Sequence, residues 1–185
     1  MVKRRVGAGL LALALVVTTS INTRPAAAAS AAEIDRDVDA ALAKLYDNVP
    51  DARKFVENAR GVLVFPSVVK AGFLIGAQYG DGALRRQGKT VGYYNTVAAS
   101  YGLQAGVQSF GYVLFFMSES ALGYLDKSEG FELGMGPSIV VLDAGKAKAM
   151  TTTTMQNDIY AFIFDQRGLM AGAGLQGSKI SRVER

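Results

Sequence analysis

The chain has 185 residues, 20 of them basic and 16 acidic, and it contains no histidine and no cysteine. This length fits one domain preceded by a leader. The missing residue types exclude Ser-His and Cys-His nucleophiles, imidazole or thiolate metal sites and disulfides. We therefore expect a protein that is not an enzyme, holds no cofactor or metal, and has a core without covalent cross-links.

Residues 1–30 have the pattern of a cleavable secretion signal. Lys3, Arg4 and Arg5 form a basic start, residues 6–17 are apolar, and Ala27-Ala28-Ala29 supplies an A-x-A cleavage site. We expect cleavage near Ala29 or Ala31 and an exported protein, periplasmic or extracellular and peripheral to a membrane. A membrane anchor is the alternative, although the apolar run is shorter than the ~20 residues that a spanning helix needs.

Removal of the leader changes the charge. Four basic residues precede the expected cleavage site, Arg24 among them, and no acid does, so the formal net charge of +4 falls to zero. Non-specific phosphate binding needs a net or strongly local basic field. We therefore expect no nucleic-acid partner.

Residues 31–49 have the periodicity of an amphipathic helix, with Ile34, Val38 and Leu45 on its apolar face. The acidic residues Glu33, Asp35, Asp37 and Asp39 lie in its first half, where they complement the helix dipole. A metal or partner site is the alternative reading of these acids. Pro50 then leads into a second short helix over residues 51–58.

The stretch GVLVFPSVVKAGFLIGAQYGDGAL, residues 61–84, has the apolar character of a membrane span, but Pro66 and Lys70 interrupt it. We expect instead two strands joined by a bend at Pro66, followed by a tight turn at Gly80-Asp81-Gly82.

Beyond this stretch the sequence alternates short apolar runs with turn signals. Residues 117–125 read as a short helix with Ser118 as its N-cap. Turn signals lie at residues 87–89, 143–145 and 166–168. The expected strands cover residues 62–65, 73–79, 83–87, 91–95, 105–116, 131–133, 138–142, 158–164 and 169–176.

Several of these strands are apolar on both faces, as in residues 158–164, and need cover on both sides. Glycines inside strands, such as Gly102, Gly106 and Gly111, favour bends in a coiled sheet over ligand contacts. The expected fold class is α+β, with N-terminal amphipathic helices packed on a curved, barrel-like, mainly antiparallel sheet. We expect residues 31–185 to form a single domain.

Catalytic patterns are weak. Ser67 and Lys70 form an S-x-x-K, and Ser178 precedes Lys179, but the partner motifs of Ser-Lys enzymes are missing. We expect no catalytic residue, and a structural role for Lys70 at its bend.

The candidate lipid-binding residues are Lys70, Arg85, Arg86 and Lys89, the last three beside the expected Gly80–Gly82 turn. If they face one anionic surface, each contributes about 1 kcal/mol near a negatively charged membrane, and the attraction is salt-sensitive. An ordinary solvated hairpin is the alternative.

The motif ARGVLVFPSVVKAGF at residues 59–73 resembles the opening signature of the SYLF domain family. The likeness continues in GLQAGVQ at residues 102–108, FFM at 115–117, GLMAG at 168–172 and LQGSKI at 175–180. The resemblance implies a lipid-binding domain, since eukaryotic members associate with phosphoinositide membranes and, in yeast, with actin. A leader and no added domain resemble the bacterial exported branch, so we do not expect actin as a partner.

These observations predict a non-enzymatic lipid-binding protein of the cell envelope, which associates with anionic phospholipid headgroups or shelters an apolar lipid moiety. The alternative is an envelope scaffold that binds a protein partner without binding lipid directly. A third reading, an outer-membrane protein built of strands, is weakened by the glycine-broken strands and the helical start.

Overall fold

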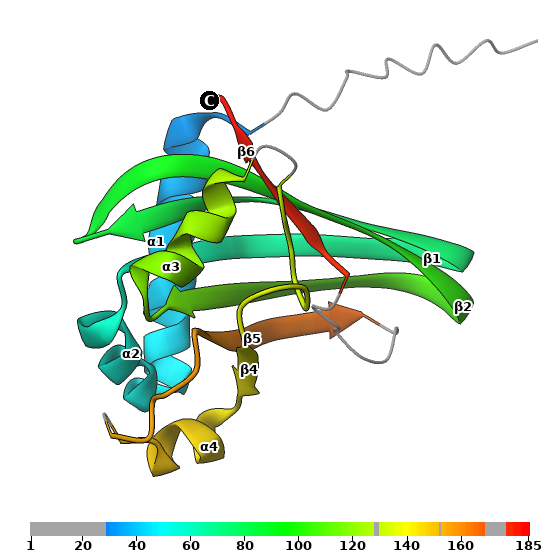
Figure 1. The fold of residues 1–185 in the computed structure, drawn as a ribbon. Coiled ribbons are helices and arrows are strands. Elements are labelled where there is room, and N and C mark those ends of the chain that lie inside the picture. Colours follow the sequence, from blue (N-terminus) through cyan, green and yellow to red (C-terminus); the bar gives the residue numbers. More distant parts are fainter. Residues whose placement is uncertain (1–28, 128–129, 152, 169–176) are drawn as a thin grey trace, which may run out of the picture.

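The computed structural model describes residues 29–127, 130–151, 153–168 and 177–185. Within these ranges the chain forms a strongly curled, six-stranded sheet with helices packed around it (Figure 1). The strand order is β3-β6-β2-β5-β4, and β1 pairs with β2 off this path. All pairings are antiparallel except the parallel pair β4–β5. The expected α+β class and the mainly antiparallel, curved sheet are confirmed.

The elements of the described part follow one another in a simple order. Helices and 3-10 turns are α1 (Ala31–Asn48), η1 (Pro50–Ala52), α2 (Arg53–Asn58), α3 (Glu119–Leu122), η2 (Gly123–Asp126) and α4 (Ala144–Ala149). Strands are β1 (Gly61–Arg86), β2 (Lys89–Phe116), β3 (Phe131–Glu132), β4 (Ile139–Leu142), β5 (Ile159–Gly168) and β6 (Lys179–Val183).

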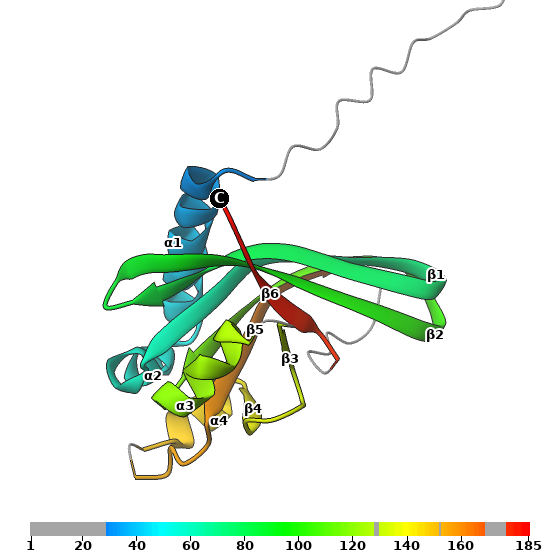
Figure 2. The same ribbon diagram turned by 45° about the horizontal axis from the view of Figure 1, so that its top comes forward.

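Helix α1 begins with a capping box. The Ser30 hydroxyl accepts from the Glu33 backbone N–H, and the Glu33 carboxylate accepts from the Ser30 backbone N–H. The periodic apolar residues Ile34, Val38 and Leu45 are buried against the sheet, as expected from their spacing. Figure 1 and Figure 2 show α1 lying across the sheet near the β1–β2 turn.

Strands β1 and β2 form one long hairpin that dominates the fold. The expected turn at residues 87–89 is confirmed, with Gln87 and Gly88 both at positive φ. The expected strands at residues 62–65, 73–79 and 83–87 are parts of the single strand β1. Those at 91–95 and 105–116 both belong to β2.

The bend of this hairpin lies elsewhere than expected. At Pro66 the ladder only shifts register, between Phe65 and Val68, and β1 continues. The hairpin turns back on itself around Gly72, where a Cβ would lie 2.4 Å from Gly76 Cα. The next irregularity is at Leu74, which has φ 62° and stands alone between two paired residues that face residues 101 and 105 of β2. Strand β2 thus takes the longer path around this bend.

The expected tight turn at Gly80-Asp81-Gly82 is wrong. These residues lie inside β1 and pair with residues 94–96 of β2. A Cβ on Gly82 would lie 2.2 Å from the Val64 carbonyl oxygen, so the second half of β1 crosses directly over its first half. The glycines therefore permit a close backbone approach rather than a chain reversal.

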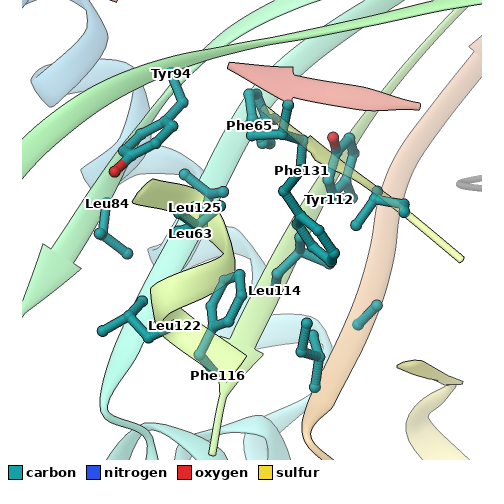
Figure 3. Close-up of a cluster of buried hydrophobic side chains, with 14 of the residues drawn as sticks. Leu63, Phe65, Leu84, Tyr94, Tyr112, Leu114, Phe116, Leu122, Leu125 and Phe131 are labelled. Atoms are coloured by element: carbon teal, nitrogen blue, oxygen red, sulfur yellow. The ribbon is translucent and has the colours of Figure 1, made fainter. Parts of the chain in front are cut away.

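Two apolar clusters lie on opposite faces of the sheet, which explains the strands that are apolar on both sides. Along β1, Val62 and Val64 join the cluster under α1 and α2, whereas Leu63 and Phe65 point into the curl. In Figure 3, side chains from β1, β2, α3, η2 and β3 converge on that inner cluster. The expectation of cover on both faces is confirmed for the strand segments that contribute to these two clusters.

Three smaller predictions have mixed outcomes, and one strand was not predicted. Ser118 caps α3, as expected, by accepting from the Ala121 backbone N–H at 3.1 Å. The turn expected at residues 143–145 is wrong, because Asp143 caps α4 and its carboxylate accepts from the Lys146 backbone N–H. Strand β6 was not expected, and the strand expected at residues 169–176 lies outside the described residues.

Candidate functional site

The four predicted lipid-binding residues lie at two ends of the β1–β2 hairpin. Arg85, Arg86 and Lys89 flank the turn, whereas Lys70 pairs with Gln108 two residues before the bend at Gly72. Because β1 runs between the two ends, the structure does not bring Lys70 together with the other three.

Within the turn group, the arginines are engaged in ion pairs. Arg85 Nη2 lies 2.8 Å from Asp39 Oδ1 and donates to the Asp35 carbonyl oxygen, and its side chain is 14% exposed. Arg86 Nη2 lies 2.7 Å from Glu119 Oε1. Lys89 is exposed at the turn. Arg85 thus anchors α1 to the sheet, a role that the sequence pattern did not indicate.

A cleft of about 470 Å³ lies beside this turn, between α1, α2 and the start of β1. Its lining mixes charged groups, Arg60 and Glu57 among them, with apolar ones such as Leu42 and Val62. Arg60 was not among the predicted residues. Because Arg85 and Arg86 at its rim already pair with the carboxylates of Asp39 and Glu119, these two arginines are less available to an anionic headgroup.

The opposite end of the hairpin is apolar and exposed. Phe73 is 75% exposed, Ile75 64%, Val107 59% and Leu74 51%. We call these four residues the apolar bend. Full burial of one such side chain contributes about 1.5–3 kcal/mol. Because these four side chains are mostly exposed, a large part of this stabilisation is still available to a binding partner. Figure 1 and Figure 2 show β1 and β2 extending past the helices toward this end.

The apolar surface continues along both arms of the hairpin from the bend. Most of the exposed large hydrophobic side chains of the described residues lie there: Val69, Phe73, Leu74, Ile75, Tyr79, Val97 and Val107. Monomeric proteins rarely leave contiguous apolar patches exposed without an interaction that uses them.

Charged residues are missing from the same part of the sequence. Between Lys70 and Asp81 no residue is charged, and between Lys89 and Glu119 none is either. The exposed apolar residues of the bend are thus bordered by uncharged chain on both strands. The glycine pair that flanks the bend, Gly72 opposite Gly106, together with this charge-free composition is the signal that sequence reasoning missed.

The inner face of the curl near the bend is polar but uncharged. Gln78, Gln108 and Thr96 are buried there, and Gln78 Nε2 donates to the buried Ser178 hydroxyl at 3.2 Å. Burial raises the pKa of the Tyr112 hydroxyl far above its usual value, and the Thr96 side chain lowers this pKa by a smaller amount. These groups stay neutral, so this interior does not attract a charged headgroup.

Among the described residues, no cluster of three or more carboxylates is arranged to hold a metal ion. Within the same ranges, the helices are all too short or too polar to cross a bilayer.

Comparison with known protein families gives a match to the second part of the chain. Residues 97–185, which include most of β2 and everything after it, are similar to the family described as Ysc84, Las17-binding protein actin regulator, whose domain is the SYLF domain. No curated protein matches the chain. The resemblance noted in the sequence is thereby confirmed over this half of the chain.

Proposed function

Because the chain belongs to the SYLF family over residues 97–185, we propose that it is a non-enzymatic lipid-binding protein of the cell envelope. In this proposal the chain is exported by its N-terminal signal and acts at the surface of a membrane. Its ligand is a phospholipid, recognised through an anionic headgroup or an apolar moiety.

The observation that carries the proposal is the exposed apolar surface of the β1–β2 hairpin, which is concentrated where the sequence has no charge. An ordinary solvated hairpin has charged or polar side chains on its open face. Here Phe73 and Ile75 are among the most exposed large hydrophobic side chains of the described residues. A lipid ligand removes this surface from water.

Sedimentation with vesicles tests the proposal. Protein purified after expression of the full sequence is mixed with phosphatidylcholine vesicles, with and without phosphatidylglycerol, at low and high salt. We expect co-sedimentation with vesicles, stronger for the anionic ones at low salt. Protein that stays in the supernatant with every vesicle contradicts lipid binding.

A paired charge reversal, Arg86→Glu with Lys89→Glu, examines the predicted basic residues at the turn. Arg85 is left unchanged because it anchors α1. Reduced binding to anionic vesicles alone supports a headgroup contact at the turn. Unchanged binding removes that contact and leaves the apolar surface as the binding element.

An envelope protein-interaction domain is the second candidate, because the matched family is described by a protein partner and an actin-regulatory role. A pull-down from envelope extract that recovers one protein, with no vesicle binding, favours this candidate. We do not extend the actin role to an exported chain.

A further inference from the structure

We propose that the apolar bend, Phe73, Leu74, Ile75 and Val107, is the element that enters the membrane, and that it does so at the boundary between headgroups and acyl chains. This inference rests on the proposed lipid-binding function and specifies which surface carries it. The partner is a phospholipid bilayer.

The shape of the bend favours penetration over enclosure of a ligand. The four side chains lie at an end of the hairpin and are between 51% and 75% exposed, so they protrude from the part of the protein that the structure describes. Because these apolar side chains protrude from the protein, they leave water only when they enter an apolar phase such as the interior of a bilayer. A cleft that could hold an apolar moiety lies instead at the other end, beside α1 and α2.

The distribution of charge also favours entry of the bend into a bilayer. The residues nearest to the bend on both strands are uncharged, so shallow entry of the bend itself takes no charged side chain of β1 or β2 out of water. Lys70, half-buried and three residues before Phe73, lies where an anionic headgroup would meet the rim of the inserted part. Tyr79, 47% exposed on the returning arm of β1, has the amphipathic character of interfacial residues.

The small exposed area of the bend argues against a protein partner or a second copy of this chain. Stable protein interfaces bury roughly 800 Å² on each side. The four partly exposed side chains of the bend supply only on the order of a few hundred Å². A bilayer needs neither a large interface nor matching hydrogen bonds.

The backbone of the bend limits how deeply it can enter the bilayer. Around Leu74 the pairing between β1 and β2 is irregular, and unpaired backbone groups are not tolerated in the hydrocarbon centre. Interfacial elements lie about 5–10 Å into the boundary region, where water still reaches the backbone. We therefore expect shallow insertion.

The chain has no tryptophan, so one introduced tryptophan reports from a single position. Phe73→Trp places the probe in the bend, and Met135→Trp places a control at a similarly exposed apolar position, 65% exposed, between β3 and β4. Both variants are titrated with anionic vesicles that contain lipids brominated near the glycerol end or near the end of the acyl chain. Co-sedimentation of the unmodified protein is measured in parallel.

We expect a blue shift of at least 10 nm and at least two-fold quenching for Phe73→Trp, stronger with the shallow bromines, and no change for Met135→Trp. If the unmodified protein co-sediments with vesicles but the fluorescence of Phe73→Trp does not change, the inference is overturned while lipid binding stands. Absence of co-sedimentation refutes the proposed function itself. A blue shift of Phe73→Trp without vesicles, together with a doubled mass in light scattering, overturns the inference in favour of self-association.

Discussion

At position 82, the absence of a side chain decides whether β1 can lie across itself. The Cβ of any other residue would lie 2.2 Å from the Val64 carbonyl oxygen and 2.7 Å from a Phe65 ring carbon. Both groups belong to the buried start of the strand and cannot move aside cheaply, since interiors are close-packed. Gly82 is therefore a packing residue of the fold rather than a turn residue.

Substitution of this glycine gives a prediction on stability. Gly82→Ala should lower the free energy of unfolding by about 1–3 kcal/mol, because the added methyl group forces the two halves of β1 apart. Urea unfolding followed by circular dichroism measures the change.

Gly123→Ala is the matched control, because a Cβ there meets nothing within 4 Å and the residue has helical φ −61°. We expect the control to be as stable as the unmodified protein, or more stable by up to about 1 kcal/mol. Equal stability of Gly82→Ala and Gly123→Ala would refute the close crossing of β1.

At the scale of elements, helix α1 is held to the sheet by ion pairs at two places. Arg85 on β1 reaches Asp39, and Lys44 lies 2.7 Å from Asp165 on β5. The hydrogen bond from Lys44, with a further one from Arg167, holds the pKa of the Asp165 carboxyl below its usual value. The charged form of Asp165 thus stabilises the docking of α1.

The pH dependence follows from the direction of this pKa shift. A lowered pKa in the folded state adds stability above the unfolded pKa of about 3.9, and this stability is lost as the pH falls through the folded pKa. Asp165→Asn should therefore be less stable than the unmodified protein at pH 7, by under about 1 kcal/mol for such exposed pairs.

Asn is a suitable replacement because Asp165 has φ 52°, a conformation that Asn also adopts. Thermal unfolding between pH 2 and 7 measures the difference, which should vanish toward the acid end. A difference that stays constant over this range contradicts a role for the Asp165 charge.

The elements that the sequence predicted well are those with a local signal. Helix α1 follows from its periodicity, the start of α3 from Ser118, and the hairpin turn from Gln87-Gly88. The error at Gly80–Gly82 arose because a close backbone approach and a turn require the same residue type. Only the contact between residues 64 and 82, far apart in sequence, distinguishes the two.

The candidate site was predicted less well for a related reason. Arg85, Arg86 and Lys89 are adjacent in sequence, but their charge is partly cancelled by acids on α1 and α3 that only folding brings near. The apolar residues 73–75 were expected in a covered strand, since a local pattern does not reveal which end of a strand extends beyond its covering helices.

For the molecule as a whole, the two ends of the β1–β2 hairpin differ in character. The turn end carries ion pairs and helices, and the bend end carries exposed apolar side chains in a charge-free part of the chain. In the membrane association that we propose, this polarity orients the protein with the bend in the bilayer and α1, α2 and the turn toward water. The helices then serve to stiffen the sheet that presents the bend.

The most direct test of this account compares vesicle binding of two matched variants. Phe73→Asp places one negative charge on the apolar bend, and Met135→Asp places one negative charge on a comparably exposed residue elsewhere. Because both side chains are exposed, the fold should survive, and circular dichroism checks this before the measurement. We predict at least a ten-fold loss of binding to anionic vesicles for the bend variant and none for Met135→Asp. Equal binding by both variants would contradict it.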